Sequence, residues 1–173
     1  MKALYTIGYE RAALDDFLIT LRQAGVTLLL DIREIPISRR KGFSKTALKQ
    51  AVEAVNIDYL HEKRLGSPKA IRDQLHRDRR DYDLFFKRFD IYLQTQIDLL
   101  RTLATQLPGK VALMCYERDP QICHRRAVAF ALAELTGLTP HHLGVWKGHG
   151  VKRQETATRV DSGQSVPATE LAI

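Results

Sequence analysis

The sequence predicts a single-domain α/β protein with a mostly parallel sheet of about five strands and helices on both faces. Short apolar runs typical of strands alternate along the chain with segments in which apolar residues recur at helical spacing. Several of the strand runs are almost continuously apolar, as in "VTLLLDI", which is typical of parallel strands buried on both faces. A length of 173 residues suits one compact domain.

The first half of the chain opens as β-α-β. We expect a strand over residues 3–9, a helix over 13–24 that ends at Gly25, and a second strand over 26–33. A loop broken by Pro36 and Gly42 follows, and Ser44 can then cap a helix. A third strand is expected over 57–61, another helix opens at about Pro68, and a single long amphipathic helix is expected over 81–106.

The second half supplies a strand over 108–117, a helix over 125–136 closed by Gly137, and a fifth strand over 138–146. We therefore expect one domain over residues 1–146 and a flexible tail over 147–173, where the composition becomes polar and loses its periodicity.

Composition restricts the class of protein. The content of 45% hydrophobic and 27% charged residues is that of an ordinary globular protein. No apolar run approaches the roughly 20 residues of a membrane span, and the N-terminus lacks the pattern of a signal peptide. We expect a cytoplasmic protein with two reduced cysteines and no contact with a membrane. The sequence leaves its oligomeric state open.

The formal net charge of +7 predicts an anionic partner, either nucleic acid or a phosphorylated small molecule. Basic residues cluster at 33–45, "REIPISRRKGFSK", where Glu34 is the single acid. A second run, "HRDRR" at 76–80, is equally well explained as a solvated helix face.

Polar clusters follow each of the five predicted strands, so a parallel sheet places them at one edge, where α/β proteins bind their ligands. We expect Cys115 to be a nucleophile or thiol carrier, with Glu117 or Asp31 as acid, base or orienting group. The residues expected to bind an anionic substrate are Gly8, Tyr9, Arg33, Ser38, Arg39, Cys123, His124 and Arg125.

The segment "CYERDPQICHRR" at 115–126 gives the sharpest hypothesis. His124 and Arg125 lie at a predicted helix start, where free backbone N–H groups and the helix dipole favour an anion. The same field lowers the pKa of a nearby thiol. The placement of Cys115 after a buried strand resembles that of the nucleophile in cysteine-dependent phosphatases and rhodaneses, and "DIRE" at 31–34 is similar to the rhodanese "DVRE" pattern. However, Arg125 lies ten residues after Cys115, whereas the arginine of those enzymes follows after about six.

Zinc and redox chemistry are the alternatives for the two cysteines. Cys115, Cys123 and His124 form a C-x7-C-H set that His141 or His142 can complete. Against zinc, there is no C-x2-C pair, and adjacent Cys123 and His124 are expected to point in different directions. A disulfide couple is disfavoured because the cysteines do not form a C-x-x-C motif. We therefore expect neither a metal nor a cofactor, with zinc as the alternative.

Five short motifs in order make the sequence similar to the family called domain of unknown function 488. They are "TIGY" at 6–9, "DIREIPISRR" at 31–40, "YL" at 59–60, "LGS" at 65–67 and "CYERDPQICHR" at 115–125, and the resemblance spans roughly residues 3–145. Ser67 replaces a glycine of the family pattern, and Tyr9 takes a position often held by histidine. The resemblance implies the fold and a candidate site, but no substrate.

Two functions follow from these observations. The first is an enzyme that uses Cys115 on a phosphate-bearing substrate held by the basic residues. The second is a noncatalytic module that binds nucleic acid or a nucleotide through the basic loop. An accessory subunit with an acidic partner is a third possibility.

Overall fold

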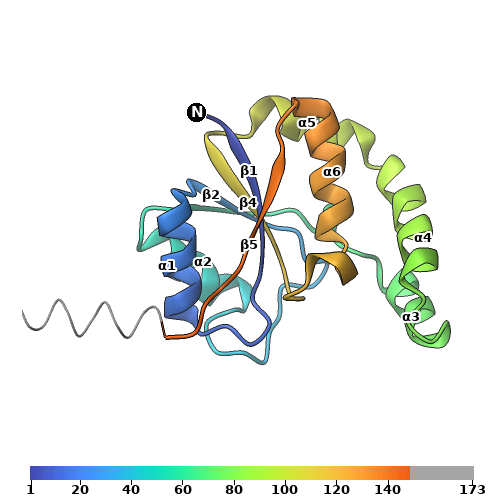
Figure 1. The fold of residues 1–173 in the computed structure, drawn as a ribbon, viewed down its shortest axis with the longest axis horizontal. Helices are drawn as coiled ribbons and strands as arrows, with labels where there is room; N and C mark the ends of the chain where they lie inside the picture. Colours follow the sequence, from blue (N-terminus) through green and yellow to red (C-terminus); the bar gives the residue numbers. More distant parts are fainter. Residues whose placement is uncertain (149–173) are drawn as a thin grey trace, which may run out of the picture.

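The protein is described by a computed structural model over residues 1–148. Five parallel strands form one sheet in the order β3-β2-β4-β1-β5 (Figure 1). The strands are β1 (Ala3–Gly8), β2 (Leu28–Asp31), β3 (Asp58–His61), β4 (Lys110–Cys115) and β5 (Pro140–Leu143). The predicted fold class is confirmed, while most of the tail predicted over 147–173 lies outside the described residues.

Six α-helices connect the strands. They are α1 (Leu14–Ala24), α2 (Lys45–Glu53), α3 (Lys69–Arg77), α4 (Tyr82–Gln94), α5 (Ile97–Gln106) and α6 (Arg125–Thr136). Helices α1 and α6 end, as predicted, at Gly25 and Gly137, whose φ angles of 70° and 72° are left-handed and favour glycine. Within residues 1–148, none of the helices has the length and apolar character needed to cross a bilayer.

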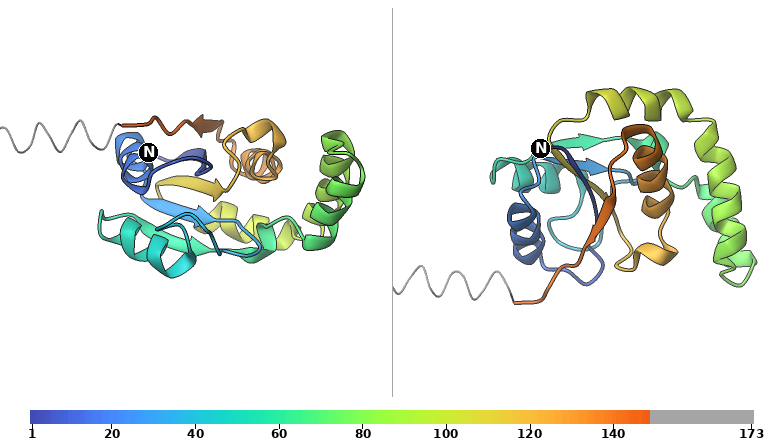
Figure 2. Two further views of the ribbon diagram at one scale, coloured as in Figure 1. Left: turned by 90° about the horizontal axis from the view of Figure 1, so that it is seen from below. Right: turned by 45° about the horizontal axis from the view of Figure 1, so that its top comes forward.

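The single long helix predicted over residues 81–106 is wrong, because the chain turns at Thr95 and Gln96 between α4 and α5. The Thr95 side-chain hydroxyl donates to the carbonyl of Tyr92 at 2.6 Å, a local bond of the kind that competes with helix continuation. The turn lets α5 pack against α6, while α4 contacts both α3 and α6. Figure 2 shows α4 and α5 running in clearly different directions.

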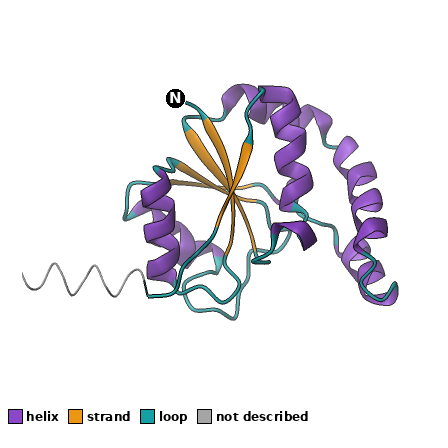
Figure 3. Cartoon of the chain, viewed as in Figure 1, coloured by secondary structure: helices purple, strands orange, loops and turns teal. Residues whose placement is uncertain are grey.

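Helices lie on both sides of the sheet (Figure 3). Each face of the sheet carries its own apolar core. Helices α4, α5 and α6 cover one face, where Val111 and Leu113 of β4 are buried. Helices α1 and α2 cover the other face, where Ala112 and Met114 of the same strand are buried. Side chains thus alternate between the two faces along each strand. A polar side chain at the end of a strand therefore lies next to the helices of one face only.

Polar clusters were predicted to follow all five strands, but the one at the fifth strand, "HHLG" at 141–144, does not, because its two histidines lie inside the strand. His141 and His142 lie inside β5, where they pair with Tyr5 and Thr6 of β1. The Nδ1 atom of His142 lies 2.7 Å from the hydroxyl of Thr6. Neither histidine therefore belongs to the group of loops that follow the strands.

Candidate functional site

The predicted site residues lie at one edge of the sheet but belong to two faces. Asp31 lies on the same face of β2 as Leu29, beneath α1 and α2. Cys115 lies on the same face of β4 as Val111 and Leu113, beneath α6. Because successive side chains of a strand point to opposite faces, the structure does not bring Asp31 and Cys115 together. Two buried clusters result, and a basic surface hollow lies beside them.

The first cluster is built around Asp31, which is fully buried. Arg33 donates to both of its carboxylate oxygens, from Nε to Oδ1 at 2.8 Å and from Nη2 to Oδ2 at 2.6 Å. The hydroxyl of Tyr59 donates to Oδ2 at 2.6 Å. The remaining nitrogen of Arg33, Nη1, donates to the hydroxyl of Tyr9 at 2.9 Å and to the carbonyl of Phe43 at 2.8 Å.

These contacts leave Arg33 little capacity to hold a ligand. Four of its five N–H donors are engaged inside the protein, and the side chain is buried. Burial alone lowers the pKa of Arg33, but the hydrogen bonds and charge of Asp31 outweigh it and raise that pKa. Burial and the hydrogen bond to Asp31 raise the pKa of Tyr59. The buried ion pair and its hydrogen bonds therefore hold the ends of β2 and β3 against the loop at 33–45.

The second cluster gathers Cys115, Glu117, Cys123 and His124, whose ligand-type atoms all lie within 4.8 Å of one another. The Cys115 thiol donates to Oε2 of Glu117 at 3.1 Å, and its sulfur lies 3.7 Å from Nδ1 of His124. The ring of His124 packs edge-on against Phe89 of α4. The expectation that Cys123 and His124 point apart is wrong, because the turn at 120–122 directs both side chains toward Cys115. This set of thiols, imidazole and carboxylate is one that can hold a thiophilic metal ion.

Burial has the largest effect on the pKa values of the two thiols, Cys115 and Cys123. It raises the pKa of Cys115 and raises the pKa of Cys123 well above its usual value. Burial also opposes the charge on Glu117, but His124 and the thiol of Cys123 outweigh it and lower the pKa of Glu117. The lowered thiol pKa expected from the start of α6 is therefore absent, because desolvation exceeds the favourable field at Cys115.

Arg125, predicted to bind an anion, donates its side-chain hydrogen bonds to protein atoms, two of which are backbone carbonyl oxygens. Its Nη1 donates to the carbonyl of Glu117, its Nη2 donates to the carbonyl of Arg118 at 3.0 Å, and its Nε donates to the hydroxyl of Thr6 at 3.3 Å. The side chain is almost completely buried. In this arrangement Arg125 fixes the loop that follows β4.

Gly8, predicted to approach a substrate, instead approaches that same loop. A Cβ atom at this position would lie 1.8 Å from the carbonyl oxygen of Glu117. The close approach of backbone to backbone therefore explains the glycine.

The exposed part of the predicted site is a basic hollow of about 700 Å³, to which we refer by this name below. Its lining consists of Ile37, Ser38, Arg39, Arg40, Lys41 and Tyr116. Three of these side chains are cationic and none is acidic. Ser38 accepts from the backbone N–H of Arg40 at 3.1 Å, and Arg40 donates to the carbonyl of Ala12 at 2.7 Å, which holds the loop in place.

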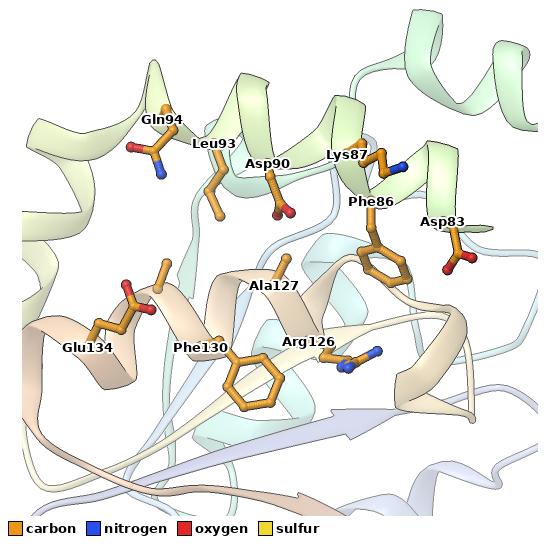
Figure 4. Close-up of a pocket in the computed structure, with 11 residues that line it drawn as sticks. Asp83, Phe86, Lys87, Asp90, Leu93, Gln94, Arg126, Ala127, Phe130 and Glu134 are labelled. Carbon is orange, nitrogen blue, oxygen red and sulfur yellow. The ribbon is translucent and has the colours of Figure 1, made fainter. Parts of the chain in front are cut away.

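A second hollow of about 660 Å³ lies between α4 and α6, away from the strand ends (Figure 4). Phe86 and Phe130 enter it from the two helices, and Arg126 lies over both rings at 5.8 Å and 5.7 Å from their centroids. Its lining contains three acidic residues, Asp83, Asp90 and Glu134, and two basic residues, Lys87 and Arg126. None of the predicted site residues belongs to this hollow.

Sequence reasoning missed several members of these sites: Tyr59 in the first cluster, and Ile37, Arg40, Lys41 and Tyr116 in the basic hollow. Tyr59 faces Asp31 because β3 pairs with β2 in the register Leu29 to Tyr59, and that pairing cannot be derived from the sequence. Tyr116 had a detectable signal, since an aromatic residue directly after a buried strand and next to a charged loop is expected to be exposed. Tyr116 is 47% exposed.

The fold and these clusters define the chain as a parallel α/β protein with two buried polar clusters at the carboxyl edge of its sheet and a basic hollow beside them. The model of the family described as Domain of unknown function DUF488 matches residues 13–132, and the chain belongs to this family. No curated protein and no solved structure matches the chain.

Proposed function

We propose that this protein binds a phosphate-bearing ligand, namely a nucleic-acid strand, at the basic hollow. The observation that carries the proposal is the lining of the hollow, which combines three cations with an exposed aromatic ring and contains no carboxylate. Proteins that bind single-stranded nucleic acid combine positive charges along the phosphate backbone with aromatic rings on which bases stack.

Tyr116 is oriented by the protein rather than free to rotate. Its ring meets the buried ring of Tyr9 edge-on at 5.4 Å between centroids, and Tyr9 in turn stacks on Phe43 at 4.5 Å. A ring held in this way loses little conformational entropy when a base stacks on it. The exposed side chain of Ile37 adds apolar surface to the same hollow.

A strand suits this hollow better than a small enclosed ligand. Small-molecule sites bury most of their ligand in a largely apolar cleft. Here Arg39, Arg40 and Lys41 are all exposed, so the hollow opens to solvent. The net charge of +7 also belongs to residues 1–148, since residues 149–173 contain equal numbers of basic and acidic residues.

The geometry gives less support to the cysteine-dependent enzyme expected from the sequence. Cys115 is 4% exposed, its pKa is raised by burial, and the guanidinium groups of Arg33 and Arg125 are engaged with protein atoms. The catalytic roles of Cys115, Glu117 and Asp31 stay predictions, as does the cytoplasmic location.

The proposal is tested by measuring the affinity of the purified chain for a fluorescent single-stranded oligonucleotide. We expect the double variant Arg39→Ala, Lys41→Ala to bind about tenfold more weakly at low salt, because two exposed ionic contacts contribute up to about 1 kcal/mol each. Tyr116→Ala removes the stacking ring and is expected to cost about 1–3 kcal/mol for the base that it contacts.

A charge-matched control separates the basic hollow from a general effect of net charge. The double variant Lys49→Ala, Arg101→Ala removes two exposed cations that form ion pairs on α2 and α5. It is expected to bind like the unaltered protein. Equal weakening in both double variants, or no binding by the unaltered chain, would refute the proposed site.

A further inference from the structure

Cys115, Glu117, Cys123 and His124 have the geometry of a preformed metal site, and this feature is independent of the basic hollow. Their four ligand-type atoms lie within 4.8 Å of one another. Cys115, Cys123 and His124 are buried, and Glu117 is partly buried. Both cysteines are free thiols.

The local fold explains why residues spaced so irregularly in sequence converge. Strand β4 ends at Cys115, which points toward α6. The following loop closes in a short 3-10 turn, Pro120–Ile122 (η2), which the carboxylate of Asp119 caps by accepting from the N–H of Gln121 at 2.8 Å. This turn returns the chain to the end of β4. Cys123 and His124 then arrive beside Cys115 at the start of α6.

His124 is held in the tautomer that a metal ligand needs. Its Nε2 lies 3.0 Å from the carbonyl oxygen of Ile32. A carbonyl can only accept, so Nε2 carries the hydrogen, and in the neutral ring Nδ1 keeps its lone pair. Nδ1 is the atom that faces the sulfur of Cys115 at 3.7 Å. Metal-binding histidines almost always donate their second ring N–H to a carbonyl or carboxylate in this way.

The spacing of the ligand atoms is close to that of a tetrahedral centre, and one of the two measured distances falls within its range. Bond lengths of about 2.3 Å to sulfur and about 2.0–2.1 Å to nitrogen and oxygen place neighbouring ligand atoms of a tetrahedron roughly 3.3–3.8 Å apart. The sulfur of Cys115 lies 3.7 Å from Nδ1 of His124 and 3.1 Å from Oε2 of Glu117. The second distance is shorter than this range, so the Glu117 carboxylate must move away from the sulfur when an ion enters.

We propose that Cys115, Cys123, His124 and Glu117 bind one zinc ion in a closed tetrahedral site. Two thiolates and an imidazole are soft or borderline ligands that select zinc over magnesium and calcium, which prefer all-oxygen sites. On binding, each thiol releases its proton to solvent and the sulfur donates its electron pair to the metal, with no change of oxidation state.

The site joins four parts of the fold: the end of β4, the loop after it, the start of α6 and, through the bond from His124 to Ile32, the end of β2. Tyr116 lies in sequence between two of the ligands. With four protein ligands, the ion has a structural role, because no position is left for a substrate.

Zinc binding is measured on the full, reduced chain after treatment with a chelator, by titration in competition with a chromogenic zinc chelator. We expect one zinc ion per chain, and loss of that zinc in Cys115→Ser, Cys123→Ser and His124→Gln. His142→Gln is the control, because His142 is exposed, contacts the Thr6 hydroxyl at 2.7 Å and lies outside the cluster. It is expected to keep the zinc.

Substitution by cobalt on the unaltered chain tests the proposal without any variant that can misfold. Cobalt in this site is expected to give absorption bands from thiolate-to-metal charge transfer and the strong visible bands of tetrahedral geometry. Absence of zinc uptake, or weak octahedral-type cobalt spectra, would overturn the proposal. Zinc affinity unchanged in Glu117→Gln would overturn Glu117 as the fourth ligand. Because these measurements need no oligonucleotide, their outcome is separate from that of the basic hollow.

Discussion

At the carboxyl edge of the sheet, Asp31 and Arg33 form an ion pair that is buried inside the protein. Asp31 is fully buried, and its two oxygens receive hydrogen bonds from Arg33 and Tyr59. Buried ion pairs lose much of their solvation, so their value depends on complete hydrogen bonding. Here the pairing is bidentate, and the fit explains why a charged pair is tolerated in this position.

Asp31→Asn leaves the buried guanidinium of Arg33 without a counter-charge. We expect the free energy of unfolding to fall by about 3 kcal/mol or more, as measured by urea denaturation. Asp98→Asn is the control, since the Asp98 side chain is 94% exposed in its ion pair with Arg101, and a change within about 0.5 kcal/mol is expected there. A similar small change in both variants would contradict the anchoring role of Asp31.

At the scale of the elements, helix α4 is positioned by the apolar side chains along its buried face. On α4, Phe85, Phe89 and Leu93 are buried, while Ile91 on the same helix is 72% exposed. Phe89 also meets the ring of His124. The packing of α4 thus supports the segment that carries two of the proposed zinc ligands.

Phe89→Ala opens a cavity in the apolar core where α4 packs against α6. We expect a loss of about 3–5 kcal/mol in the free energy of unfolding. Ile91→Ala, on the same helix, is expected to change it by no more than about 0.5 kcal/mol. Comparable losses in the two variants would mean that α4 packs differently from the arrangement described.

The elements could largely be predicted from the sequence, because hydrophobic periodicity and the stops at Gly25 and Gly137 are local signals. The break at Thr95 could not, since the apolar spacing continues through it and only packing against α6 requires the turn. The division of Asp31 and Cys115 between two faces was predictable in principle from strand alternation. The convergence of Cys123 on Cys115 was not, because it depends on the geometry of the loop at 116–122.

At the scale of the whole molecule, the proposed function depends on the positive charge of one surface, the basic hollow. The basic residues of the 33–45 segment were predicted to meet an anion, and the structure divides them. Arg33 is buried with Asp31, whereas Arg39, Arg40 and Lys41 line the basic hollow with Tyr116. The side chains of Arg39, Arg40 and Lys41 are exposed and accessible to phosphates. The proposed binding site therefore supplies at most three ionic contacts.

The dependence of oligonucleotide affinity on salt tests this account most directly. Three phosphate contacts predict that log K falls against log salt concentration with a slope of about 2, at roughly 0.7 per contact for a single strand. Arg39→Ala combined with Lys41→Ala is expected to reduce that slope to about 0.7, while Lys49→Ala combined with Arg101→Ala leaves it unchanged. Affinity that is independent of salt, or a slope that the first double variant does not reduce, would contradict the assignment of the basic hollow as the binding site.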